Sequence, residues 1–195
     1  MKSWSSLFVI ALMSVGHLVA QTPWRIDKAH SQIKFTVTHM LVSEVDGIFK
    51  DYDVVVAATK DDFTDASIEA TIKAASINTE NERRDNDLRS DSFFNSERFP
   101  EITFKSTSFE KVGEKQYKIH GDLTIRDVTK KVTFNATNTG TLKTSRGLLS
   151  GWKAELTINR FDYGLKYNRA IETGGLAVSQ DVKITVTLRL NKPSA

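Results

Sequence analysis

Histidines are the first side chains to consider as chemical groups, because the chain of 195 residues contains four of them and no cysteine. His30, His39 and His120 lie at spacings that match no metal-binding motif, and no cysteine is present to complete a zinc site. We therefore predict no metal site, no cofactor and no catalytic residue. The lack of cysteine also excludes disulfide bonds, so packing alone must stabilise the fold.

Arginines form the second set of side chains that could do chemistry. Arg83, Arg84 and Arg89 lie close together in a polar segment that also carries several Asp and Glu residues. One interpretation is a solvated surface on which these charges pair. The other is a cationic rim that meets an anionic head group such as a diphosphate, because guanidinium groups bind phosphate through paired hydrogen bonds. The residues alone leave both interpretations open.

The overall charge excludes one class of function. The chain has 27 basic and 24 acidic residues, a formal net charge of +3 and 39% hydrophobic residues. Protein surfaces that bind nucleic acid carry dense Lys and Arg stripes, and this sequence has none. We therefore predict a soluble globular protein that does not bind nucleic acid.

The N-terminus resembles an export signal. Lys2 precedes an apolar run from Leu7 to Met13, and the segment ends with Ala20 before Gln21. A basic start, a short apolar core and a small residue at the end are typical of a cleaved signal peptide, and the run is too short for a membrane span. We predict a signal peptide over residues 1–20, cleaved after Ala20, one domain over 21–195, a periplasmic location and no stable membrane insertion.

Beyond residue 21, apolar and polar residues alternate. This period of two predicts strands with one buried and one solvated face, which is typical of antiparallel sheet. Eight such strands can close into a barrel that has no free edge. The alternating runs lie at 33–39, 66–74, 117–126, 152–159 and 182–190, with further strands expected near 45–59, 101–109 and 130–142.

One segment departs from this alternation. Thr79 and Glu82 have the spacing of a capping box, which predicts a short surface helix near residues 80–91 that begins after Thr79. Phe93 and Phe94 follow at once, so the helix would deliver two aromatic rings toward the barrel. Pro100 is expected to end the segment before the next strand.

Pattern alone does not decide whether the barrel is hollow. An eight-stranded barrel is either filled by side chains or holds one small ligand. Large inward residues such as Phe104 and Phe134 favour a filled interior. Small residues on the inward face favour a cavity: Ala66, Ala70, Ala74, Gly121, Ala136 and Ala154.

Four ordered motifs resemble those of the YceI-like family. They occupy residues 24–49, 81–100, 120–130 and 159–164, so that the resemblance covers essentially all of 22–191. It implies an eight-stranded antiparallel lipocalin-like β-barrel in the periplasm. It also implies a long isoprenoid chain, from a polyprenyl diphosphate or a quinone-like lipid, inside an apolar tunnel. Asp87 and Asp127 depart from the family pattern, which often has His and Gly at these positions.

The resemblance leads to three hypotheses of function. The first is a protein that binds an isoprenoid or other long-chain lipid for transport, storage or sequestration, with a homodimer as an open alternative to the monomer. The second is a lipid isomerase or cyclase that uses His39, Arg160 and Asp162. The third is an interaction module in stress responses with a filled barrel. The residues expected to line the apolar tunnel are Phe35, Val37, Ile72, Phe93, Phe94, Ile119, Leu123, Trp152, Leu156 and Phe161.

Overall fold

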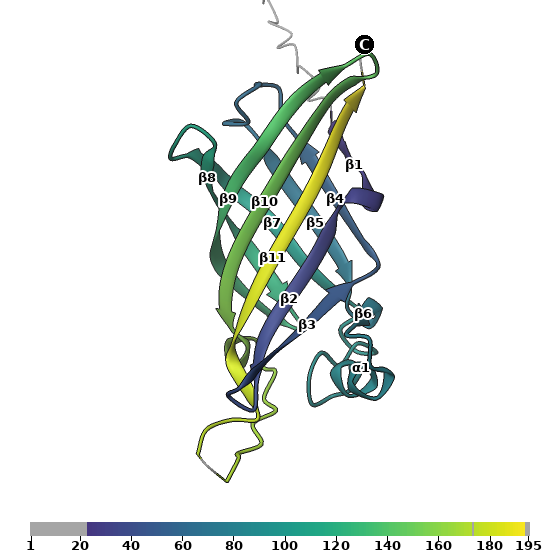
Figure 1. Ribbon diagram of the computed structural model, residues 1–195, viewed down its shortest axis with the longest axis vertical. Helices are drawn as coiled ribbons and strands as arrows, with labels where there is room; N and C mark the ends of the chain where they lie inside the picture. The colour runs from purple at the N-terminus through teal and green to yellow at the C-terminus, as the bar shows by residue number, and fades with distance from the viewer. Residues whose placement is uncertain (1–22, 173, 194–195) are drawn as a thin grey trace, which may run out of the picture.

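The protein is described by a computed structural model over residues 23–172 and 174–193, so the predicted signal peptide lies outside the described residues (Figure 1). The long strands are steeply inclined to the axis of an elongated barrel. Within the described ranges there is one α-helix, α1 (Glu82–Arg89), and three 3-10 turns, η1 (Lys28–His30), η2 (Ala74–Ser76) and η3 (Arg160–Tyr163). The strands are β1 (Pro23–Ile26), β2 (Gln32–His39), β3 (Ser43–Phe49), β4 (Tyr52–Ala57), β5 (Ser67–Lys73), β6 (Ile77–Asn78), β7 (Glu101–Lys111), β8 (Gln116–Ile125), β9 (Val128–Thr144), β10 (Gly147–Asn159) and β11 (Val178–Pro193).

These strands close into an antiparallel barrel of eight staves. A stave is here one full-length position in the barrel wall, formed by one strand or by two strands in succession. β1 and β2 form one stave interrupted by η1, because both of them pair with β11. β3 and β4 form the next stave, since β3 pairs with β2 and β4 pairs with β1. The remaining staves are β5, β7, β8, β9, β10 and β11, and β11 returns to the first stave. The predicted all-β eight-stranded barrel is therefore confirmed.

The two ends of the barrel are built differently. The upper end in Figure 1 carries the β4–β5 loop (58–66), the β7–β8 turn and the β9–β10 turn. The lower end carries the β2–β3 turn, the segment 79–100 with α1, the β8–β9 turn and the segment 160–177. Long irregular segments that lie beside a rigid barrel are the usual place for a binding site, and here they are at the lower end.

The predicted helix is present, but its cap differs from the prediction. Asn81 is the N-cap, and its side-chain oxygen accepts a hydrogen bond from the backbone N–H of Arg84 at 3.0 Å. Thr79 instead donates its backbone N–H and its hydroxyl to the buried carboxylate of Asp85, at 2.8 and 2.6 Å. A buried carboxylate must be hydrogen-bonded. Because Thr79 supplies these hydrogen bonds to Asp85, it does not act as the helix cap. No helix of the described ranges is both long and apolar enough to cross a membrane.

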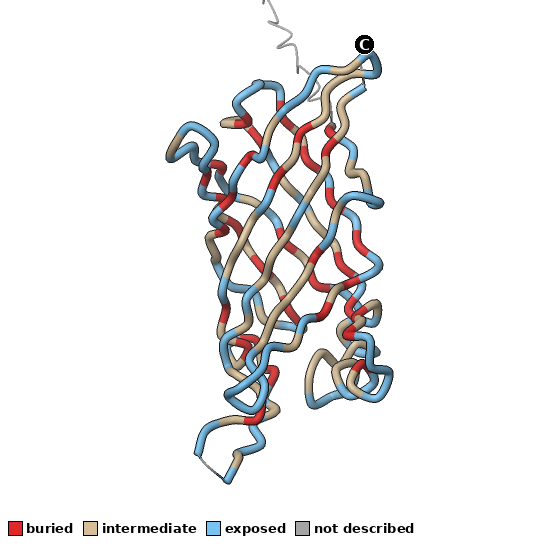
Figure 2. Tube along the Cα trace, viewed as in Figure 1, coloured by how far each residue is buried: buried red, intermediate tan, exposed pale blue. Residues whose placement is uncertain are grey.

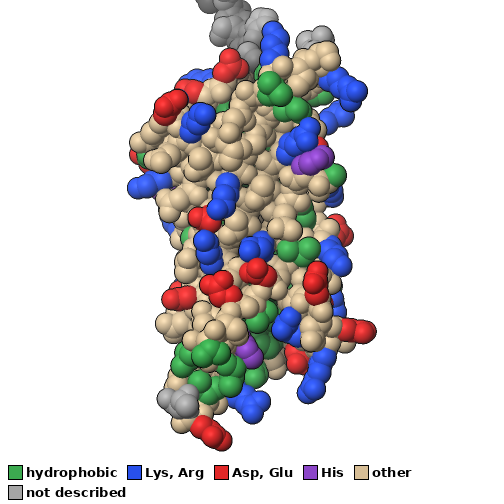
Figure 3. All heavy atoms as spheres, in the orientation of Figure 1, with side chains coloured by type: hydrophobic (Ala, Val, Ile, Leu, Met, Phe, Trp, Pro, Cys, Tyr) green, Lys and Arg blue, Asp and Glu red, His purple; other side chains and the backbone are tan. Residues whose placement is uncertain are grey.

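The barrel wall has a polar outer face and an apolar inner face. On β8, Tyr117, Ile119 and Leu123 are buried, while Lys118 between them is exposed. Figure 2 shows the same alternation along most strands, and Figure 3 shows charges of both signs interspersed on the outer wall. The inward residues of β11, such as Ile184 and Val186, are only half-buried although the wall surrounds them. Solvent-sized space therefore remains inside the barrel.

An aromatic cluster closes the upper end. Phe63, from the β4–β5 loop, is 2% exposed and has φ +59°, a conformation that is rare outside glycine. Its ring centroid lies 5.0 Å from Trp24 and 4.9 Å from Trp152. Tyr117 adds a further contact to Trp152 at 4.9 Å. The strained loop therefore inserts a ring that fills the barrel at this end.

Asp65 holds this loop in shape. Its carboxylate accepts hydrogen bonds from the Thr59 hydroxyl, from the Thr59 N–H at 2.9 Å and from the Lys60 N–H at 3.1 Å. These bonds, the hydroxyl first, lower the pKa of Asp65 to about 2. A carboxylate whose pKa is lowered on folding stabilises the folded state at pH values above its ordinary pKa of 3.8. This contribution is lost as the pH falls toward 2.

We expect Asp65→Asn to lower the melting temperature at pH 7 by about 2–4 °C, which corresponds to about 1 kcal/mol for a solvent-accessible group. The difference from the unmodified protein should shrink between pH 4 and pH 2, because the carboxylate becomes protonated first in the unfolded state and then, near pH 2, in the folded state. Thermal unfolding followed by circular dichroism across this range measures it. Asp61→Asn, at an exposed position of the same loop, is the control. A difference that stays constant down to pH 2 would contradict the assignment.

Half of the small inward residues leave space and half do not. Ala70, Ala136 and Ala154 line the interior cavity described below. Gly121 does not, because a Cβ at this position would lie 2.5 Å from the Phe104 ring and 2.5 Å from the main-chain oxygen of Lys105. Ala66 and Ala74 are buried in the core and also lie outside the cavity lining. A small side chain therefore indicates either a cavity or a close neighbour, and only the structure distinguishes the two.

Candidate functional site

The barrel encloses an apolar cavity of about 650 Å³. This volume lies in the range of small-molecule sites, roughly 300–1,000 Å³. The cavity extends from Trp152 and Leu190, near the aromatic cluster, to Tyr167 at the lower end. Residues from most strands of the barrel and from the segment that follows α1 contribute to its wall. Eight of the residues predicted to line a tunnel are among them, and their role in binding stays a prediction: Phe35, Val37, Ile72, Phe93, Phe94, Ile119, Leu123 and Trp152.

The structure places three predicted site residues away from the cavity lining. Leu156 is half-buried and packs against the core. Phe161 follows the end of β10, where η3 interrupts the alternation, and its ring lies 4.3 Å from the Arg160 guanidinium. Arg89 donates to the main-chain oxygens of Ala75 at 2.8 Å and Ile77 at 2.9 Å, so its guanidinium joins α1 to the chain around β6.

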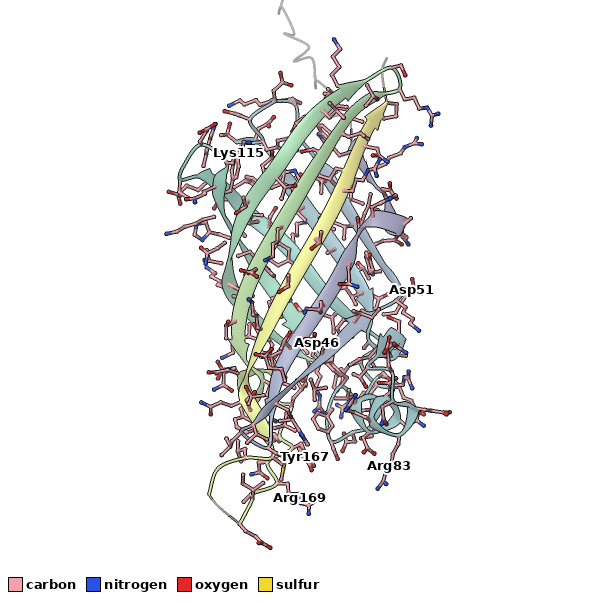
Figure 4. The ribbon with its side chains drawn as sticks, in the orientation of Figure 1. Asp46, Asp51, Arg83, Lys115, Tyr167 and Arg169 are labelled. Atoms are coloured by element: carbon pink, nitrogen blue, oxygen red, sulfur yellow. The ribbon has the colours of Figure 1, made fainter. Side chains whose placement is uncertain are left out.

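The lower end of the cavity is bridged by two aromatic side chains. The ring of Phe93, after α1, stacks on the ring of Tyr167, with centroids 5.0 Å apart and planes inclined by 28°. Arg126, in the β8–β9 turn, donates to the main-chain oxygens of Phe93 at 3.1 Å and Gly164 at 2.8 Å. Figure 4 shows Tyr167 and Arg83 at this end of the barrel, with Arg83 projecting from α1. The segment after α1 and the segment after β10 therefore contact each other at the lower end of the cavity.

The remaining two predicted rim residues, Arg83 and Arg84, differ in exposure and in hydrogen bonding. Arg83 and Arg84 both border the cavity. Arg84 donates to the Thr79 hydroxyl and to the Thr79 main-chain oxygen, both at 2.8 Å, whereas Arg83 is exposed. Asp87, one turn further along α1, is also exposed and borders the same opening. The acidic departure from the family motif, Asp87, therefore borders the cavity together with Arg83 and Arg84.

Exposed apolar residues lie at the same end. Met40, Leu41 and Val42 form the tip of the β2–β3 turn and are 44%, 60% and 87% exposed. Met40 and Leu41 both have positive φ angles, so the tip is a tight turn built without glycine. Figure 3 shows hydrophobic side chains gathered at the lower end of the barrel.

Arg160 is the polar side chain buried deepest in the cavity wall. It is 3% exposed and borders the cavity together with Leu165 and Val178. Its guanidinium donates to the main-chain oxygens of Leu165 at 2.7 Å, Ser179 at 2.9 Å and Val178 at 3.0 Å. Burial lowers the pKa of Arg160. The sequence suggested only acid–base chemistry for this residue. Arg160 follows β10 directly, and the alternation of that strand, continued by one residue, places it on the inward face; this was the signal for a residue of the cavity wall.

The three residues of the enzyme hypothesis do not form a connected set. His39 borders the cavity and is exposed, whereas Asp162 is exposed and outside the lining. Arg160 bonds to main-chain oxygens, and no hydrogen bond in the described part of the chain joins it to His39 or Asp162. General acid–base catalysis needs groups within hydrogen-bond reach of a shared substrate position. Of these three residues, only His39 and Arg160 border the cavity.

A closed eight-stranded barrel with a hollow apolar interior defines the class of lipocalin-like barrels. Residues 24–190 match the YceI-like domain, and the chain belongs to the YceI-like family. The UPF0312 protein SA2479 of Staphylococcus aureus is 40% identical over 164 residues, which cover 83% of this chain and 93% of that protein.

Solved structures share the fold. The YCEI protein of Campylobacter jejuni is 28% identical, with a TM-score of 0.70 and full coverage of both chains. A polyisoprenoid binding domain from Saccharophagus degradans is 15% identical, with a TM-score of 0.62, and the match covers 89% of this chain and 99% of that one. At that identity the second likeness concerns the fold alone.

Proposed function

We propose that this protein binds one long apolar isoprenoid lipid inside the barrel, as a carrier or store and not as an enzyme. The apolar cavity of about 650 Å³ is the observation that carries the proposal. Each buried methylene contributes about 0.8 kcal/mol, so a few isoprene units supply most of the affinity without many polar contacts. The binding of polyisoprenoid that is named for the Saccharophagus degradans domain of the same fold supports this ligand class.

The polar end of the lipid is expected at the lower end of the barrel. Arg83 and Arg84 border the opening there, while the upper end is filled by aromatic rings. A polyprenyl diphosphate and a quinone-like lipid are both candidates, and Arg89 would then act by holding α1 in place. The proposed periplasmic location depends on the N-terminal export signal, residues 1–20.

The direct experiment is to purify the full chain from its periplasm, extract it with organic solvent and identify the lipids by mass spectrometry. We expect a long-chain isoprenoid in roughly equimolar amount, since one cavity holds one chain. Protein that carries no lipid, and that neither binds nor is stabilised by added geranylgeraniol, would contradict the proposal.

A ring placed inside the cavity should block binding. Ala154 borders the cavity and lies opposite Ala136 on the neighbouring strand, so Ala154→Phe would fill space between two small residues. Displacing the contacts of two to three methylene groups costs about 2 kcal/mol, or about 30-fold in the Kd for geranylgeraniol. Bound lipid is measured after gel filtration.

Thr157→Phe is the matched control, because Thr157 is exposed on the outer face of the same strand, β10. This variant should bind geranylgeraniol like the unmodified protein. Equal binding by the Ala154→Phe variant, with the fold retained, would show that the lipid does not occupy the barrel interior.

A further inference from the structure

We propose that Arg160 anchors the polar end of the bound lipid, and that this end carries a negatively charged oxygen of the carboxylate or phosphate class. The inference rests on the proposed function and deepens it. It moves the head group from the exposed rim at α1 to a buried position in the cavity wall, beneath η3 and the start of β11.

Arg160 is a buried cation without a counter-ion. Its side chain is hydrogen-bonded to three main-chain oxygens, and none of the ion pairs in the described ranges includes it. The carbonyl dipoles hold the guanidinium in place but do not neutralise its charge. A buried charge is costly unless it is paired, so a site of this kind favours a ligand that supplies the opposite charge.

Donors are available for such a ligand. A guanidinium carries five N–H donors, and the main-chain oxygens of Leu165, Val178 and Ser179 take one each. The remaining donors are on the two terminal nitrogens, which suits a bidentate oxyanion. The ring of Phe161 lies 4.3 Å from the guanidinium and supports it from a position outside the cavity lining.

The other charged residues of the cavity wall are mostly cations, and they are paired, hydrogen-bonded or exposed. Lys34 is paired with Asp46 at 3.2 Å, Arg84 is bonded to Thr79, and Arg83 is exposed. Among the residues that the structure describes, Asp87 is the one carboxylate in the lining, and it is exposed at α1. The net charge of the lining is therefore positive, and Arg160 is its buried member.

This placement predicts a charge preference that salt does not remove. Salt screens exposed charges strongly and buried pairs much less. A head group at Arg160 would keep its preference at high salt, whereas one at Arg83 would lose it. The tail would then extend from Arg160 through the apolar interior toward Trp152.

The experiment compares two probes with the same chain, geranylgeranyl monophosphate and geranylgeraniol. The full chain is incubated with an equimolar mixture, passed over gel filtration in 0.1 or 1 M NaCl, and extracted, and both lipids are quantified by mass spectrometry. We expect the phosphate to be preferred at least about tenfold, as for a hydrogen bond to a charged group, at both salt concentrations. A matched pair of palmitate and hexadecanol extends the comparison to carboxylate.

Variants test whether Arg160 is the source of the preference for phosphate over alcohol. Arg160→Met should abolish it while the alcohol still binds, and Arg169→Met, at an exposed position of the same end, should retain it. If Arg160→Met does not fold, the effect of salt on the phosphate preference of the unmodified protein still distinguishes a head group at Arg160 from one at Arg83. A preference that disappears in 1 M NaCl or in Arg83→Met, or no preference at all, would overturn the inference. Binding of neither probe would instead overturn the proposed function.

Discussion

Phe63→Ala is expected to destabilise the protein by about 3–5 kcal/mol, because it removes a buried ring and leaves a cavity where the aromatic cluster closes the barrel. The ring is 2% exposed and contacts Trp24 and Trp152. For a domain of this size the melting temperature should fall by about 10 °C. Alanine would keep the positive φ of this position. No relief of backbone strain would therefore offset the stability lost with the ring.

The same variant tests which end of the barrel is closed. Without the ring, the cavity extends upward past Trp152, so lipids with longer chains should bind better relative to geranylgeraniol. Phe63→Leu is the control, since it keeps a large apolar side chain and should lose much less stability. Thermal unfolding together with competition between polyprenols of different length measures both effects. An unchanged melting temperature, or an unchanged preference for length, would show that Phe63 does not close the interior.

Gly121→Ala is expected to destabilise the protein by about 2–3 kcal/mol through overpacking. The added Cβ would lie 2.5 Å from the main-chain oxygen of Lys105 and 2.5 Å from the Phe104 ring. A main-chain atom of a neighbouring strand cannot move aside as the end of a flexible side chain can. The register of β7 and β8 already shifts between Ser106 and Ser108 at this point, so further displacement disturbs the barrel wall.

Gly113→Ala provides the matched control, because the nearest atoms to its new Cβ belong to the flexible side chain of Gln116, at 3.3 Å. Urea denaturation of both variants gives the two free energies of unfolding. Equal stability of the two variants would contradict the close approach at Gly121.

The sequence pattern located part of the cavity wall. Phe35, Ile119 and Trp152 were placed on the inward face by the alternation of their strands, and they border the cavity, while their role in binding stays a prediction. Phe161 lies outside the cavity lining, because η3 begins directly after β10 and alternation no longer sets the direction of its side chain. Arg89 lies outside the lining for a different reason. Its partners are main-chain oxygens of Ala75 and Ile77, and a sequence does not show which carbonyl groups will lack partners.

The sequence by itself determined the all-β class, the strand count, the surface helix and the inward face of the five clearly alternating runs, because these depend on local periodicity and on the requirement that a sheet has one apolar face. Only the tertiary structure decided that the interior is hollow, since space depends on which residues lie next to one another on neighbouring strands: Ala154 lies opposite Ala136, whereas Gly121 lies against the Phe104 ring. The structure alone also showed Arg160 as a buried cation that has no counter-ion among the described residues, because burial and ion pairing are properties of the assembled wall.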